Sequence, residues 1–215
     1  MKIHLETELK EHLEQIWANP DYQKFCEHSY MAPSVIPDTR LHFIGLNPSY
    51  TAGHEKVQFF DLSIPEKLHR YYHKFQKIAD DHGIEWGYLD LFFFRKTSSK
   101  QVEALRKNKN GGEFLMDQQK LSFGILRKLM ESDQPQVIVV CNATSRKILK
   151  KYFDFSHYAP GKSSWDDLWD DHFGTYRMGK HFWFFSGMLS YGVTENETFR
   201  RLEWQLKKVI DHINK

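Results

Sequence analysis

Residues 41–50 have the sequence Leu41-His42-Phe43-Ile44-Gly45-Leu46-Asn47-Pro48-Ser49-Tyr50. The first six are mostly apolar and are followed by an Asn-Pro pair, a pattern that predicts a buried strand ending in a loop. Further along the chain, three apolar runs predict strands at residues 88–94, 136–141 and 181–185. The intervals between consecutive predicted strands are long enough to hold helices.

Helix signals occupy those intervals. A capping box at Ser63-Ile64-Pro65-Glu66 predicts one start, and residues 114–130 and 144–152 predict two further helices. A final helix is predicted, with Thr194 and Glu197 expected to cap its start. The alternation predicts an α/β fold, a three-layer α/β/α sandwich with a mostly parallel sheet of about four strands. Its site is expected beyond the carboxyl ends of the strands.

No repeat, linker or low-complexity tract divides the chain. We therefore expect residues 1–215 to form a single domain, with residues 1–32 as a helical arm packed on it. The arm is broken at Asn19-Pro20, and its first segment carries an apolar stripe at helical spacing.

Composition excludes several classes of protein. The chain has 215 residues, with 30 Lys plus Arg against 28 Asp plus Glu, and a net charge of +2 that permits a nucleic-acid partner without demanding one. Its two cysteines, Cys26 and Cys141, are too few for an iron–sulfur cluster or a disulfide scaffold. Apolar runs of about 20 residues are missing, so we expect no signal peptide, no membrane association and a cytoplasmic location. The sequence gives no reason to expect a cofactor, and the oligomeric state stays open.

Three predicted strand ends carry unusual residues, at Gly45 to Tyr50, Phe94 to Thr97 and Phe185 to Gly192. Gly45 to Tyr50 resembles the first motif of the uracil-DNA glycosylase superfamily. That motif is G-Q-D-P-Y, or G-[IM]-N-P-G in the mismatch-specific and single-strand-selective branches. The resemblance covers about residues 40 to 212. Phe60 lies where the family places the aromatic that stacks on a flipped base. Met188-Leu189-Ser190 is similar to the end of the family's intercalation loop.

The resemblance implies a DNA-repair hydrolase that cleaves the N-glycosidic bond of a flipped damaged or mismatched base. Asn47 would be the catalytic residue, because its carbonyl oxygen can orient a water molecule, although a carboxamide does not titrate usefully. Phe60 would supply the apolar wall, and Met188 with Leu189 would wedge into the DNA stack. The expected binding residues are Gly45, Pro48, Ser49, Tyr50, Phe60, Arg95, Ser186, Gly187, Met188, Leu189 and Ser190. No metal site is expected, since His69 and His73 have no third ligand.

Departures from the family pattern leave alternatives open. Phe185 or Ser186 stands at the position of the family's catalytic His, and Arg95, which has only donors, stands where the family has a base-reading Asn. The main alternative is a catalytically inactive member of the same fold that binds a nucleotide, nucleic acid or a protein. A hydrolase using a serine near His54 is a third possibility, without a G-x-S-x-G elbow to support it. Each feature also has a non-functional interpretation when it is considered alone. Asn47-Pro48 is a common turn, and Phe60 is of a type usually found in the core. Arg95-Lys96 would then be a solvated pair, and the acidic run at residues 165–172 a solvated loop.

Overall fold

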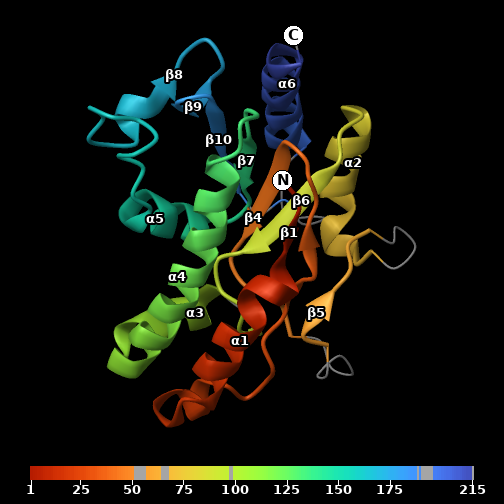
Figure 1. The fold of residues 1–215 in the computed structure, drawn as a ribbon. Helices are drawn as coiled ribbons and strands as arrows, with labels where there is room; N and C mark the ends of the chain where they lie inside the picture. Colours follow the sequence, from red (N-terminus) through yellow and green to blue (C-terminus); the bar gives the residue numbers. More distant parts are fainter. Residues whose placement is uncertain (51–56, 64–67, 97–98, 188, 190–195, 215) are drawn as a thin grey trace.

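A central six-stranded sheet organises the chain in this computed structural model, which describes residues 1–50, 57–63, 68–96, 99–187, 189 and 196–214 (Figure 1). In spatial order its strands are β6 (Trp86–Asp90), β4 (Leu41–Gly45), β7 (Val137–Val140), β10 (His181–Phe185), β9 (Thr175–Met178) and β8 (Trp169–Asp170). The first four are parallel, β9 runs antiparallel to β10, and β8 runs antiparallel to β9. The mixed α/β class and the mostly parallel sheet are thus confirmed.

The sheet has six strands rather than the predicted four. The two additional strands form a hairpin in which Trp169 pairs with Tyr176 and Asp170 with Thr175. Gly174 closes the hairpin with a φ of 64°, a conformation that favours glycine. The sequence did not predict β8, because two residues are too few to show an alternating pattern, but most side chains of residues 165–172 are exposed, as expected.

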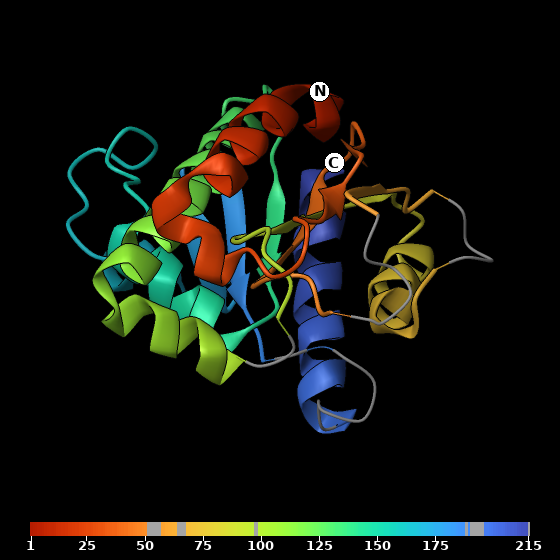
Figure 2. The ribbon, with the colours of Figure 1, turned by 90° about the horizontal axis from the view of Figure 1, so that it is seen from below.

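Helices cover both faces of the sheet (Figure 2). One face is covered by α1 (Leu5–Ala18), α3 (Ser99–Lys107), α4 (Lys109–Met130) and α5 (Ala143–Tyr152), and the other by α2 (His73–Asp81) and α6 (Asn196–Ile213). Alternation along β4 sends Ile44 into the first core and Phe43 into the second. Parallel strands buried on both faces account for the nearly continuous apolar runs in the sequence.

The N-terminal segment packs on α4 and on the sheet. It comprises β1 (Ile3–His4), α1 and a 3-10 helix (Pro20–Phe25), and the predicted break at Asn19-Pro20 is confirmed. The Asn19 side chain accepts a hydrogen bond from the Asp21 amide and so caps the second segment. Two small two-stranded pairings complete this region: β1 with β3 (Val35–Ile36), and β2 (Ala32–Pro33) with β5 (Phe59–Phe60).

Three predicted boundaries are corrected. β6 starts at Trp86 and ends at Asp90, whereas residues 88–94 were predicted. α2 starts only at His73, after a 3-10 turn at Arg70–Tyr72, and Ile64-Pro65-Glu66 lies outside the described residues, as does Thr194. α4 starts at Lys109, where the Asn108 side chain caps the Gly111 amide. A further 3-10 turn spans Asp166–Leu168.

Gly45 is a position at which the fold tolerates no side chain. A Cβ there would overlap the Tyr88 hydroxyl and the Asp90 carboxyl group, both of which are buried. We expect Gly45→Ala to lower the free energy of unfolding by about 1–3 kcal/mol, the usual cost of overpacking. Urea denaturation measures this change.

Gly124→Ala is the matched control. Gly124 lies within α4 with no atom within 4 Å of the added Cβ, and the helix favours alanine by up to about 1 kcal/mol. Equal stability of the two variants would contradict the close approach at Gly45.

Candidate functional site

Asn47 joins the loops that follow β4 and β6. Its Nδ2 donates to the carbonyl oxygens of Pro48 at 3.1 Å, Phe94 at 3.4 Å and Lys96 at 2.7 Å. Three surrounding carbonyl groups fix the orientation of the amide, because only its NH₂ end can face them. Among the described residues no donor reaches Oδ1, so the half-buried side chain keeps one oriented acceptor.

Arg95 is buried rather than solvated. Its side chain is 2 % exposed, and its guanidinium carbon lies 5.9 Å from the centre of the Tyr50 ring. The ring of His28 also stacks on Tyr50, with ring centres 3.8 Å apart and an angle of 11° between the ring planes. The Lys96 ammonium group donates a hydrogen bond to the Glu27 carboxylate, with 2.5 Å between Nζ and Oε2. Segment 27–30 therefore forms one wall of the site, which the sequence did not predict because no motif marks it.

A buried polar cluster occupies the carboxyl end of β6. The Tyr88 hydroxyl donates to the Asp90 carboxyl at 2.7 Å, and burial raises the pKa of Asp90 to about 7, although the Tyr88 hydrogen bond lowers it. Tyr71 and Tyr72 approach from the 3-10 turn, with their pKa values raised chiefly by burial and further by Asp90. Sequence reasoning missed Asp90. A lone carboxylate within Tyr88-Leu89-Asp90-Leu91-Phe92 was the signal that could have revealed it, since unpaired acids are rarely buried without a role.

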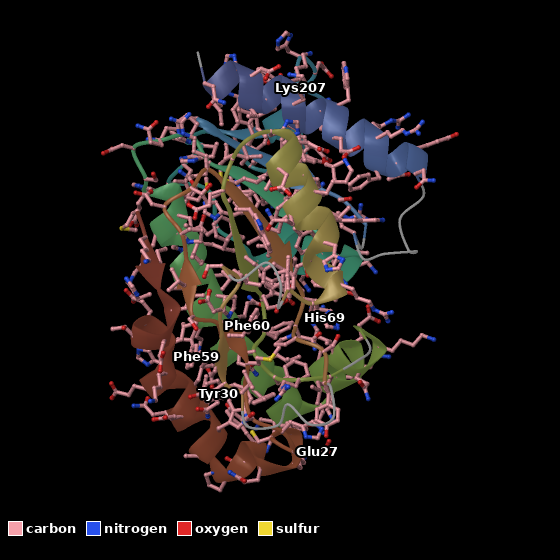
Figure 3. The ribbon with its side chains drawn as sticks, turned by 90° about the vertical axis from the view of Figure 1, so that its right-hand side faces the viewer. Glu27, Tyr30, Phe59, Phe60, His69 and Lys207 are labelled. Atoms are coloured by element: carbon pink, nitrogen blue, oxygen red, sulfur yellow. The ribbon has the colours of Figure 1, made fainter. Side chains whose placement is uncertain are left out.

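Phe60 and Phe59 point to opposite sides of β5 (Figure 3). Phe59 packs into the first core against Tyr30, with ring centres 5.7 Å apart. Phe60 is half-buried in the second core, 6.0 Å from the ring of Tyr72, which in turn lies 5.1 Å from that of Tyr88. A line of aromatic rings thus connects Phe60 to the Asp90 cluster.

The remaining predicted residues are less closely grouped. Gly45 and Pro48 are buried, Ser49 and Gly187 are exposed, and Ser186 is half-buried after β10. Leu189 is fully buried in the second core. The structure therefore corrects the expectation that Leu189 would wedge into DNA, because its side chain packs in the apolar core instead. Met188 and Ser190 lie outside the described residues.

A surface hollow of about 370 Å³ includes Ser186 and Gly187 but none of Asn47, Phe60 or Arg95. Within the described parts of the chain, no three His, Cys, Asp or Glu side chains gather as a metal site would require. None of the helices described there is long and apolar enough to cross a lipid bilayer. Neither the models of known protein families nor the curated protein sequences give a match to this chain.

Burial of Asp90 makes stability depend on pH. The folded-state pKa of about 7 exceeds the unfolded value of about 3.9, so the folded chain keeps a proton that the unfolded chain loses. The free energy of unfolding contributed by Asp90 therefore falls as pH rises from about 4 to about 7, by a few kcal/mol at most, and is constant above that. Denaturation at several pH values, compared with Asp90→Asn, measures this change.

The comparison with Asp90→Asn is needed because His42 and His181 act with the opposite sign. Burial lowers the pKa of each to about 4, so both favour the folded state increasingly as pH rises toward 6.5. Tyr88 and Cys141, which also face Asp90, have pKa values raised by burial and stay neutral in this range. A stability difference between the wild type and Asp90→Asn that is flat between pH 4 and pH 7 would contradict the buried acid.

Proposed function

We propose that this chain is a DNA glycosylase of the uracil-DNA glycosylase superfamily, with that family's three-layer α/β/α fold. It would hydrolyse the N-glycosidic bond of a damaged or mismatched base flipped out of DNA. The observation that carries the proposal is the Asn47 amide, held by three carbonyl groups at the carboxyl end of β4 with its own oxygen left to accept. Carboxyl ends of parallel strands are where such folds place their sites.

In this reaction Asn47 needs only to hold a water molecule in position. Water adds to the anomeric carbon as the carbon–nitrogen bond breaks, the base leaves as an anion that solvent protonates, and the water releases a proton to solvent. A water molecule that donates to Oδ1 has its oxygen lone pair directed outward, toward a sugar bound above the strand end. Because hydrogen bonds hold Nδ2 in place, Oδ1 already points in the required direction and the amide need not reorient during the reaction.

Asp90, although buried against Tyr88, matches the family's base-reading Asn better than Arg95 does, both in its place on the sheet and in the groups it offers. β6 ends at Asp90, so this residue, and not Arg95, stands at the strand end opposite Gly45. A protonated carboxyl group offers one donor and one acceptor, the same pair that a carboxamide offers. Phe60, two rings away through Tyr72 and Tyr88, would provide the stacking wall.

The missing family His supports the alternative, a binding protein without catalysis. The described segment 185–187 has the sequence Phe185-Ser186-Gly187, so none of its side chains can place a positive charge beside the leaving base. Catalysis would then rest on water positioning and on electrostatic contacts to the base alone. An activity assay decides between the two.

End-labelled single- and double-stranded oligonucleotides bearing uracil, hypoxanthine, xanthine or mismatched thymine test the proposal, with alkali to cleave abasic sites. We expect cleavage at one or more of these bases and a loss of at least about 100-fold in Asn47→Ala, since small misplacements of a reactant cost that much. Folding of the variant is checked by urea denaturation.

Asn108→Ala is the matched control, because it also removes an asparagine that bonds backbone, here as the cap of α4. It should cost about 1 kcal/mol of stability and leave cleavage intact. Absence of cleavage by the wild-type chain across all bases, with DNA still bound, would refute the glycosylase and leave the binding protein.

The pH dependence of cleavage tests the role of Asp90. Ionisation removes its donor, so we expect the rate at saturating substrate to fall as pH rises through about 7. Asp90→Asn keeps a donor and an acceptor at all pH values and should cleave without this fall. An identical decline in both proteins would exclude Asp90 as the group responsible.

A further inference from the structure

The hollow beside Ser186 is lined by residues of α5, of α6 and of the segment that runs from β8 to the end of β10. α5 contributes Arg146 and Lys150, which are four residues apart and so share a helix face. α6, which packs on the opposite face of the sheet from α5, contributes Arg201, and the β8–β9 hairpin with the end of β10 completes the lining. At about 370 Å³ the hollow has the scale of a small-ligand site.

The charged side chains that line the hollow are all cationic, whereas Asp166 and Asp171, which contact Lys150 and Trp169, lie outside the lining. Three cationic side chains line the hollow, and no acidic side chain is among its described lining residues. Lys150 is partly engaged, since its ammonium group lies 2.7 Å from the Tyr176 hydroxyl and 4.0 Å from Asp166. Arg146 and Arg201 are exposed and form no ion pair within the described part of the chain. Two arginines in the lining of one hollow suit a phosphate group, whose oxygens accept paired N–H donors.

Aromatic side chains provide the second feature. Trp169 is 48 % exposed, an unusual state for an indole, and packs edge-on against Tyr176 at 5.2 Å. The ring of Phe185 also lies against that of Tyr176, with ring centres 5.3 Å apart. Exposed aromatic faces beside cations are the combination that binds nucleic-acid strands, with bases stacking while phosphates pair with the cations.

We propose that this hollow is a nucleotide-binding subsite for a single strand of nucleic acid, in which Arg146 and Arg201 hold a backbone phosphate and Trp169 stacks an adjacent base. It rests on the proposed function only in taking nucleic acid as the ligand, and requires no cleavage. A free nucleotide has the same chemistry. A strand is favoured because the hollow continues to Ser186 and Gly187, at the end of β10.

Fluorescence anisotropy with an undamaged, end-labelled 12-nucleotide single strand tests the subsite in the full chain. The variant Arg146→Gln/Arg201→Gln should bind about tenfold or more weakly at low salt. Its plot of log affinity against log salt should be shallower by about 0.7, the value for one phosphate of a single strand. Trp169→Ala should weaken binding roughly fivefold or more.

The matched control is Lys147→Gln/Arg200→Gln, which removes the same charge from the adjacent positions of the same two helices. Neither residue lines the hollow. Full affinity in this control, with loss in the first pair, supports the subsite. Equal loss in both pairs, or no loss in either, overturns it. Binding of a mononucleotide but not of the strand would also overturn it.

Cleavage assays on the same variants keep the two proposals apart. If the wild-type chain cleaves a damaged base and the Arg146→Gln/Arg201→Gln variant binds and cleaves as well as wild type, only the subsite fails. If the wild-type chain binds the strand through the hollow and cleaves none of the bases, the subsite stands and the glycosylase fails.

Discussion

The parallel pairing of β4 with β6 is the constraint on which the candidate site depends. It sets Gly45 directly opposite Asp90, and the missing Cβ at Gly45 is the space that the Tyr88–Asp90 hydrogen bond occupies. The same register carries Asn47 alongside Phe94 to Lys96, where its amide finds three carbonyl groups. A shift of one residue would turn these side chains to the opposite face and remove both arrangements.

Asp90 and Arg95 are both buried near this pairing, and each avoids the cost of burying a charge in a different way. Asp90 stays neutral, because its raised pKa keeps the proton on the carboxyl group up to about pH 7. Arg95 cannot lose its charge, so its burial depends on favourable contacts such as the face of Tyr50, which His28 supports from the other side. Buried polar groups weaken a fold unless they are satisfied, and they gather where a ligand must be recognised.

Sequence alone predicted the parts of the fold that rest on continuous apolar runs. β4, β7 and β10 were placed to within a residue, because strands buried on both faces leave an uninterrupted signal. The end of β6 was missed since Leu91 to Phe94 are as apolar as the strand, although they pack as a buried loop. For the site, the loop motifs located Asn47, but the wall at His28 arises from tertiary packing that no local pattern encodes.

The strand order also links the candidate site to the hollow. Only β7 separates β4 from β10, so their carboxyl ends are two strand spacings apart, about 10 Å. A stacked strand advances about 3.4 Å per nucleotide, so that gap corresponds to about three nucleotides. Under the two proposals, one strand would occupy the hollow at the end of β10 while a base a few nucleotides away reaches the end of β4. The antiparallel β8–β9 hairpin, which the sequence did not predict, contributes Trp169 and Tyr176 to the lining of the hollow, and the proposed second contact depends on them.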